Sequence, residues 1–186
     1  MSTAPGLRAL RDRPFELLLE LELRARAAVA GALDPQAGGV WSGVAFRLGG
    51  ETFLVPRDEV REIMSVPAPL TRVPGAREWI RGLANVRGQL LPVIDLRQYL
   101  GAGVTHTDRN ARVIVVNHRE IPAGLLVDEV LGFRRFSDAD YHVEAPMVGI
   151  RCERYLGGCF RRGSEAWPVL GLRTLIESPA FLQGSA

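Results

Sequence analysis

The sequence predicts a mainly β protein in which two small β-barrels share one hydrophobic core. From residue 40 onward the chain consists mainly of short apolar stretches of strand length, separated by glycine and proline. The order of these stretches occurs twice, which indicates an internal duplication. With 186 residues, of which 47% are hydrophobic and 24% are charged, the chain has the length of one domain or of two small subdomains.

Residues 1–39 are predicted to form a helical arm followed by a linker. Asp12 can cap a helix and Pro14 can open it, and the apolar positions 17, 18, 21, 25 and 28 form one stripe. The stretch "GALDPQAGG" after this helix is rich in helix breakers and is typical of a linker. The barrel domain is expected to occupy residues 40–180.

The first copy begins with a predicted hairpin, in which "WSGVAFRL" and "ETFLVP" are the strands and Gly49–Gly50 is the turn. The next stretch, "RDEVREIM" at 57–64, is compatible with a turn of helix or with a bent strand, and both remain open. After a loop that contains proline, "QLLPVIDL" at 89–96 is predicted to be a buried strand. A brief helix over "RQYLGAG" at 97–103 follows and ends at glycine.

The second copy repeats this order. The stretch at 112–133 resembles the stretch at 43–64, and "WPVLGLRTLI" at 167–176 resembles "LPVIDLRQYL" at 91–100. The matching positions are Asp58 and Asp128 at an offset of 70, and Pro92 and Pro168, with Asp95 and Gly171, at an offset of 76. Because a unit of this size builds only a marginal core by itself, we expect the two copies to bury apolar surface against each other.

Charge and hydropathy exclude several classes of protein. The chain has 23 basic and 21 acidic residues and no long basic block, which is a poor footprint for a protein that binds nucleic acid through its charge. No apolar run approaches the roughly 20 residues that a membrane-spanning helix needs. Glutamates interrupt the leucines near the N-terminus, unlike in a signal peptide. We therefore expect a cytoplasmic protein with reduced cysteines.

The titratable residues do not form a recognisable catalytic or metal site. His106 and His118 fall in predicted polar loops, where solvent exposure is expected. His142, Cys152 and Cys159 lack the close ligand pairs of a zinc site. No phosphate-binding loop, dinucleotide fingerprint or nucleophile elbow is present. We expect no catalysis, no metal and no cofactor.

Arg87 is the strongest candidate for a contact residue. It interrupts the apolar stretch "NVRGQLLPVIDL", between the turn-forming residues Asn85 and Gly88 and just before a predicted strand. Two roles remain open. Arg87 can pair with a nearby carboxylate such as that of Asp95, or it can be presented by a rigid scaffold for protein recognition.

These motifs together resemble the CheW-like domain of bacterial chemosensory coupling proteins. The resemblance covers about residues 42–176 and includes the second-copy stretch "GLLVDEV" at 124–130. In the first copy it rests on Val60, Glu62 and Ile63, on Gly82, Asn85, Val86, Arg87 and Gly88, and on Pro92, Asp95 and Leu96. Within the family the chain is most similar to the member that serves the type IV pilus, or twitching motility, chemosensory system.

The resemblance implies a fold of two intertwined SH3-like five-stranded barrels with a shared core. It also implies a non-catalytic adaptor that couples methyl-accepting chemoreceptors to a CheA-type histidine kinase. The receptor would contribute the tip of its cytoplasmic hairpin, and the kinase would contribute its regulatory domain, in arrays at the membrane. Nucleic acid, membrane insertion and cofactors are not implied. The alternatives are a flagellar chemotaxis coupling protein and, from a different class, a small β-barrel that binds nucleic acid.

The resemblance also implies partner-binding positions. These are Val60, Glu62, Gly82, Asn85, Arg87 and Phe133. Arg87 would lie near the receptor-facing groove, where Val60 would offer an apolar contact. Glu62 and Gly82 match positions associated with partner binding, with the kinase as the expected partner. Phe133 matches a groove position that usually holds a smaller aliphatic residue, so the groove is expected to be bulkier here.

Overall fold

The computed structural model describes residues 39–184. The predicted helical arm therefore lies outside the described residues. Residues 42–136 and 140–184 form one compact unit, which contains both copies of the duplicated pattern. No helix among the described residues is long and apolar enough to cross a membrane.

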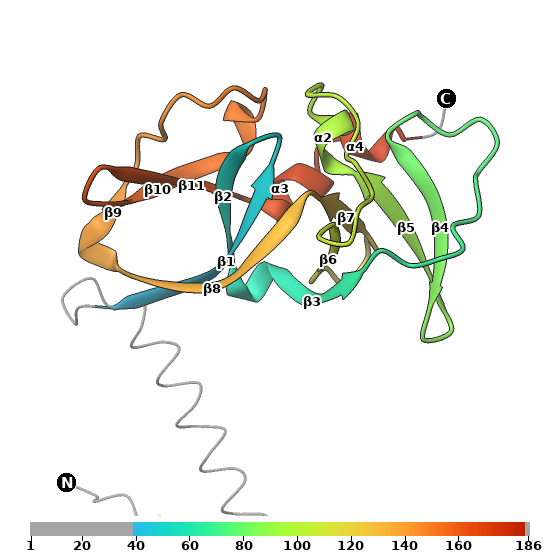
Figure 1. Ribbon diagram of the computed structural model, residues 1–186, viewed down its shortest axis with the longest axis horizontal. Helices are drawn as coiled ribbons and strands as arrows, with labels where there is room; N and C mark the ends of the chain where they lie inside the picture. The colour runs from blue at the N-terminus through green and yellow to red at the C-terminus, as the bar shows by residue number, and fades with distance from the viewer. Residues whose placement is uncertain (1–38, 185–186) are drawn as a thin grey trace, which may run out of the picture. The chain divides into compact units, whose positions relative to one another are not determined.

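The order of the elements confirms the duplication (Figure 1). The first copy contains β1 (Val40–Leu48), β2 (Glu51–Pro56), the 3-10 turn η2 (Arg57–Glu59), β3 (Val60–Ser65), β4 (Ile80–Val86), β5 (Gln89–Asp95) and α2 (Leu96–Tyr99). The second copy contains β6 (Arg112–Val116), β7 (Gly124–Val127), β8 (Glu129–Ser137), η3 (Asp138–Asp140), β9 (Tyr141–His142), η4 (Glu153–Tyr155), β10 (Leu156–Arg162), β11 (Glu165–Leu170), α3 (Leu172–Ile176) and α4 (Pro179–Leu182). The predicted hairpin, buried strand and brief helix of the first copy are all present. The stretch after the hairpin contains both of the open alternatives, a helical turn and then a strand.

The two copies exchange their hairpins. One sheet has the strand order β3-β6-β7-β5-β4, and the other has the order β8-β1-β2-β11-β10-β9. The second copy's hairpin β6–β7 therefore completes the first copy's sheet, and β1–β2 completes the second copy's sheet. Two parallel pairings make these joins, through Ile94 opposite Leu125 and Val169 opposite Leu54. The expected intertwining is confirmed. The expectation of five strands in each sheet is wrong for one of them, because the short strand β9 pairs with β10 as a sixth.

Each sheet curves until strands far apart in its order come into contact. In the six-stranded sheet, Phe136 of β8 stacks on Phe160 of β10 with the ring centroids 4.9 Å apart. In the five-stranded sheet, the two edge strands are β3 and β4, and Glu62 on β3 forms an ion pair with Arg87 directly after β4. This curvature is what a barrel requires, since closure protects the edge strands.

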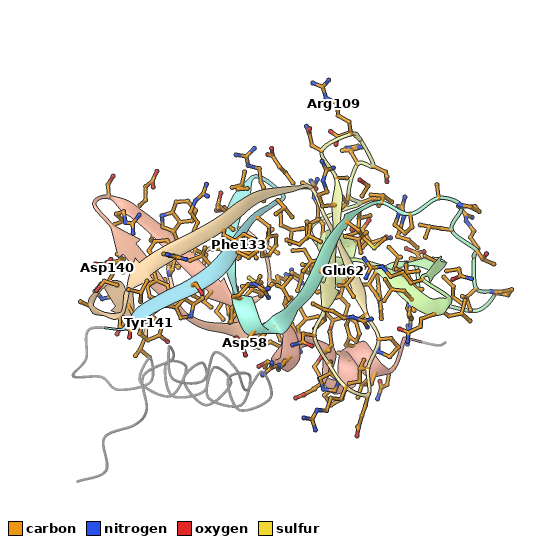
Figure 2. The ribbon with its side chains drawn as sticks, turned by 90° about the horizontal axis from the view of Figure 1, so that it is seen from below. Asp58, Glu62, Arg109, Phe133, Asp140 and Tyr141 are labelled. Atoms are coloured by element: carbon orange, nitrogen blue, oxygen red, sulfur yellow. The ribbon has the colours of Figure 1, made fainter. Side chains whose placement is uncertain are left out.

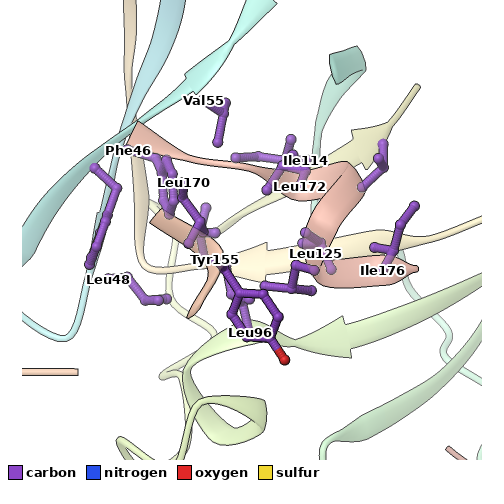
Figure 3. Close-up of a cluster of buried hydrophobic side chains, with 14 of the residues drawn as sticks. Phe46, Leu48, Val55, Leu96, Ile114, Leu125, Tyr155, Leu170, Leu172 and Ile176 are labelled. Carbon is purple, nitrogen blue, oxygen red and sulfur yellow. The ribbon is translucent and has the colours of Figure 1, made fainter. Parts of the chain in front are cut away.

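Both sheets contribute to one core, as predicted. Figure 3 shows Phe46 and Val55 from one sheet close to Ile114 and Leu125 from the other. A second, smaller apolar cluster lies within the five-stranded sheet alone and includes Val113. Side chains of β6 alternate between the two clusters, because successive residues of a strand point to opposite faces. This double burial explains why "RVIVV" and "GLLV" are continuously apolar.

The two copies cap their short helices in different ways. Helix α2 has a local cap, since the Asp95 carboxylate accepts a hydrogen bond from the Gln98 amide at 3.1 Å. Helix α3 has Gly171 at the same position and no local side-chain cap. Instead, Glu59 Oε2 accepts hydrogen bonds from the amides of Leu172 at 2.6 Å and Arg173 at 3.2 Å. A first-copy carboxylate thus caps a second-copy helix.

The stability of this contact between the copies depends on pH through the Glu59 carboxyl. Burial raises the pKa of the Glu59 carboxyl above its ordinary value of 4.5, although the two amide hydrogen bonds and the Arg173 charge act in the opposite direction. A carboxyl whose pKa is raised in the folded protein stabilises the fold below its unfolded pKa. It loses that contribution as the pH rises through the folded pKa.

We therefore predict that the stability advantage of the wild-type protein over Glu59→Gln shrinks as the pH rises above 4.5. Urea denaturation of both proteins between about pH 4 and about pH 7 measures this difference in the free energy of unfolding. A difference that grows with pH would contradict the prediction. It would mean that the amide hydrogen bonds outweigh burial and that the folded-state pKa is lowered.

Candidate functional site

The β4–β5 hairpin presents Arg87 from a strained turn. Val86 pairs with Gln89, so Arg87 and Gly88 form a two-residue turn. Their φ angles are 53° and 82°, and positive values at both positions are typical of a type I′ turn. Arg87 is the only non-glycine residue with a positive φ in the described part of the chain. A left-handed conformation costs a residue with a side chain roughly 1–2 kcal/mol.

Equivalent turns in the same protein use glycine at this position. In the second copy, Gly163 follows the last residue of β10 with a φ of 61°. In the first hairpin, Gly49 has a φ of 60°. An arginine in this conformation is therefore not required by the turn. Backbone strain that a sequence retains without a local need is a reason to look for function.

Glu62 holds the Arg87 side chain. The distance from Arg87 Nη2 to Glu62 Oε2 is 3.0 Å, and the side chains are 79% and 23% exposed, respectively. The possible pairing of Arg87 with Asp95 is wrong. Asp95 is fully buried, and its carboxylate accepts hydrogen bonds from the Thr105 amide at 3.0 Å and the Thr105 hydroxyl at 2.8 Å, in addition to capping α2. These bonds hold the Asp95 carboxylate inside the protein, away from the hairpin tip.

Both residues of the ion pair line a pocket of about 320 Å³. The pocket is built from β3, the β4–β5 hairpin and the β6–β7 connection, so both copies contribute to it. Its apolar lining consists of Val86, Leu90, Leu91, Val115, Val116 and Pro122. Leu90 is 66% exposed, so its side chain is accessible to a partner.

The charged side chains of the pocket lining are mainly basic. Arg61, Arg87 and Arg119 line the pocket, and Glu62 is its only acidic residue. Because Glu62 is already paired with Arg87, two guanidinium groups remain for other contacts. A lining that combines apolar and basic side chains fits a protein segment that presents an apolar side chain beside carboxylates.

Two of the predicted partner-binding residues, Val60 and Gly82, are buried and serve the fold. Val60 is 4% exposed and belongs to the shared core, so its side chain does not offer a surface contact in this structure. Gly82 is buried in β4 with a φ of 145°. A Cβ atom at Gly82 would lie 2.6 Å from the backbone oxygen of Thr71, which forms a bridge with Leu83.

Two others are exposed and lie apart from the pocket lining. Asn85 Oδ1 accepts a hydrogen bond from the Gly88 amide at 2.9 Å and so supports the turn that carries Arg87. Phe133 is 61% exposed on β8, and the Arg57 guanidinium lies 5.6 Å from its ring centroid. Figure 2 shows Glu62 and Phe133 on separate strands, which belong to different sheets.

The β6–β7 connection brings His118, Arg119 and Pro122 to the pocket, a contribution that was not predicted from the sequence. One signal was available. The first hairpin has a two-residue turn, whereas the corresponding connection in the second copy runs from 117 to 123. Extra length in a connection between paired strands often carries function.

The expected solvent exposure of His118 is wrong. Its side chain is only 16% exposed, and Nε2 lies 3.0 Å from Glu177 Oε1. Nδ1 accepts hydrogen bonds from the amides of Glu120 and Ile121, which places the proton on Nε2. Cys159 is buried, as expected for an ordinary thiol, and donates a hydrogen bond to the Glu144 carbonyl. His118 lies in the β6–β7 connection and Cys159 in β10, and the two side chains have separate partners.

Two further observations concern a metal site and the aromatic side chains that could stack on nucleic-acid bases. Among residues 39–184, no three histidine, cysteine, aspartate or glutamate side chains gather in a way that could hold a metal ion. Tyr99 and Tyr155, two of the three tyrosines that a nucleic-acid binder could use for stacking, hydrogen-bond to each other at 2.8 Å and are partly or fully buried.

Comparisons with known proteins agree on one family. The CheW-like domain family matches residues 42–180. The chain is 36% identical to the protein PilI of Pseudomonas aeruginosa over 91% of this chain and 94% of that protein. It is 30% identical to the protein FrzA of Myxococcus xanthus over 72% of this chain and 83% of that protein. The crystal structure of the scaffolding protein TtCheW from Thermoanaerobacter tengcongensis matches with a TM-score of 0.64 and 26% identity, over 75% of this chain and 94% of that one.

The structure predicts that Gly82→Ala destabilises the protein by at least about 2 kcal/mol, because a positive φ and a collision with backbone combine there. Gly157→Ala is the matched control, since Gly157 also lies in a strand and nothing lies within 4 Å of its added Cβ. Urea denaturation measures both changes. If Gly82→Ala is as stable as the control, the close approach of Thr71 does not constrain this position.

Proposed function

Because this chain belongs to the CheW-like domain family, we propose that it is a non-catalytic adaptor that couples chemoreceptors to a CheA-type histidine kinase. The coupling domain is assigned to residues 40–180. Its two partners are the cytoplasmic tip of a methyl-accepting chemoreceptor and the regulatory domain of the kinase, brought together in arrays at the membrane. Similarity to PilI over most of both chains supports an output through type IV pili and twitching motility.

The single observation that carries the assignment of a site is the presentation of Arg87. The side chain projects from a strained turn and is 79% exposed, and it pairs with Glu62 beside a pocket whose lining is half apolar. An exposed ion pair of this kind contributes only about 0.2–1 kcal/mol to stability. That contribution does not offset the strain of the turn, so binding of a partner is the better explanation for an arginine here.

Glu62 and Arg87 contact each other, so we assign both residues to the same partner rather than to separate ones. The kinase regulatory domain is the proposed partner of this pocket. An apolar side chain of the kinase would enter among Leu90, Leu91 and Pro122, while its carboxylates would meet Arg87 and the neighbouring arginines. Charge-assisted hydrogen bonds of this kind give both affinity and register.

Phe133 is assigned to the receptor. It lies on β8 in the other sheet and exposes most of its ring, with Arg57 beside it. An aromatic ring next to a guanidinium offers both apolar area and charge to a helical hairpin. Separate residues for the two partners would allow both to be bound at once, as coupling requires.

The proposed function predicts saturable binding of the kinase regulatory domain and of a receptor-tip fragment, each measured by isothermal titration calorimetry. The Glu62→Lys variant should bind the kinase domain at least about tenfold more weakly, because it places a second positive charge beside Arg87. It should leave receptor binding unchanged. Folded wild-type protein that binds neither partner would refute the adaptor role, and a Glu62→Lys effect confined to the receptor would refute the partner assignment.

A second prediction separates function from stability at Arg87. Arg87→Asn should leave the free energy of unfolding unchanged or raise it by up to about 1 kcal/mol, since asparagine tolerates a positive φ. The same variant should weaken binding of the kinase domain at least about tenfold. Arg109→Asn is the control, because Arg109 is an exposed arginine outside the pocket lining (Figure 2). Reduced stability with unchanged binding would make Arg87 a structural residue.

A further inference from the structure

Glu59 occupies the junction between the shared core and the candidate pocket. It is the last residue of η2 and directly precedes β3, the strand that carries Glu62. Its carboxylate is bound by the first two amides of α3, at 2.6 Å and 3.2 Å. The contact joins residues 113 and 114 positions apart in the chain. The start of β3 is therefore attached to a helix of the other copy.

Helix α3 is a rigid anchor for this contact. Leu172, Leu175 and Ile176 are all 0% exposed and belong to the shared core. Figure 3 shows Leu172 and Ile176 among side chains from both sheets. Close-packed side chains of this kind do not shift without a cost in packing. The Glu59 carboxylate, which binds the α3 amides, is thus held in a fixed position relative to the core.

Other contacts at the junction extend the attachment to the pocket. Asp58 forms an ion pair with Arg173, from Oδ2 to Nη2 at 3.2 Å. The Asn117 amide donates to the Glu59 carbonyl at 2.8 Å, and its side chain donates to the Asp58 carbonyl at 2.8 Å. Asn117 begins the β6–β7 connection, which supplies His118 and Arg119 to the pocket lining. Two of the three walls of the pocket therefore meet α3 at Glu59 and its neighbours.

A local residue at position 171 could cap α3, so a distant residue is not required for this purpose. Gly171 has φ −80° and ψ 105°, almost the same backbone as Asp95 at the start of α2, with φ −74° and ψ 100°. A short polar side chain at 171 could cap the helix locally, as Asp95 does for α2. The chain has glycine there and uses Glu59 instead. The distant cap adds a connection between the copies that a local cap would not provide.

We propose that Glu59 is a positioning residue for the partner site: by binding the amino end of α3 it fixes the start of β3, and with it the Glu62 carboxylate that holds Arg87. This inference rests on the proposed function, because it assigns Glu59 a role in the site where the kinase domain is proposed to bind. A preorganised pocket loses less entropy when a partner binds, so release of the contact should weaken binding although Glu59 itself does not touch the partner.

Three variants separate positioning from helix capping. Glu59→Ala removes the cap and the Glu59 contact together, and leaves the exposed Asp58–Arg173 ion pair in place. Glu59→Gln keeps an acceptor oxygen for the two amides. Glu59→Ala combined with Gly171→Asn supplies a local cap while the Glu59 contact stays absent. The backbone at Gly171 suits asparagine. Its added Cβ would lie 3.2 Å from the movable Thr174 hydroxyl and 3.6 Å from the Tyr155 carbonyl oxygen, which is ordinary van der Waals contact.

The first readout is the affinity for the kinase regulatory domain, measured by calorimetry, with thermal denaturation in parallel. Glu59→Ala should bind about tenfold more weakly, and Glu59→Gln should stay within about threefold of wild type. The double variant should recover thermal stability relative to Glu59→Ala and still bind about tenfold more weakly than wild type. Recovery of binding together with stability would show that Glu59 only caps α3. Wild-type affinity in Glu59→Ala would overturn the proposal directly.

A second readout needs no partner and is independent of the proposed function. Amide hydrogen exchange of the free protein reports local opening of β3 and of the β4–β5 turn. Glu59→Ala should speed exchange at Val60–Ser65 about tenfold or more. The double variant should restore slow exchange in α3 and leave exchange in β3 fast. If wild type binds no kinase domain but exchange follows this pattern, the proposed function fails and the structural part of the inference stands. Unchanged exchange in β3 in all three variants would refute the positioning role.

Discussion

The exchange of hairpins between the two copies is the constraint on which the rest of the structure depends. Neither sheet can form from one copy alone, because β5 requires β7 beside it and β2 requires β11. Both joins are parallel pairings of strands that are distant in sequence, and such pairings gain stability only after a long loop has closed. The shared core follows directly, since β6 and β7 must be apolar on both faces once they stand between two apolar clusters. Folding and function therefore belong to the duplicated whole.

The same exchange explains why the two copies were free to diverge in detail. Asp95 remains a buried local cap with Thr105 as a second partner, whereas Gly171 leaves its helix to Glu59. A carboxylate that caps a helix distant in sequence stabilises the helix and also fixes the position of its own strand. Here one end of the contact is attached to the five-stranded sheet and the other end to the six-stranded sheet. An adaptor that must hold two partners in a fixed relation benefits from such contacts, and an isolated barrel could not make them.

Arg87 shows how the site departs from the demands of the fold. Glycine stands at the corresponding turn positions 163 and 49, and arginine is strained there. The arginine and its glutamate partner are exposed enough that their attraction is screened by water. The fold would tolerate a simpler turn. A residue that lowers stability and is nevertheless presented at a pocket is what the proposed partner site requires, since sites that must bind are commonly less stable than the surrounding scaffold.

The sequence by itself determined the mainly β class, the duplication, the hairpin at Gly49–Gly50, the buried strand within 89–96 and the family, because these depend on local turn chemistry, on periodicity and on contiguous motifs. It also singled out Arg87 and Glu62. Only the tertiary structure decided which strands join the two copies, that Arg87 pairs with Glu62 rather than Asp95, that Val60 is in the core, and that Glu59 caps a helix 113 residues away. The physical reason is that partners distant in sequence are selected by packing and loop closure across the whole chain, and neither leaves a local pattern to read.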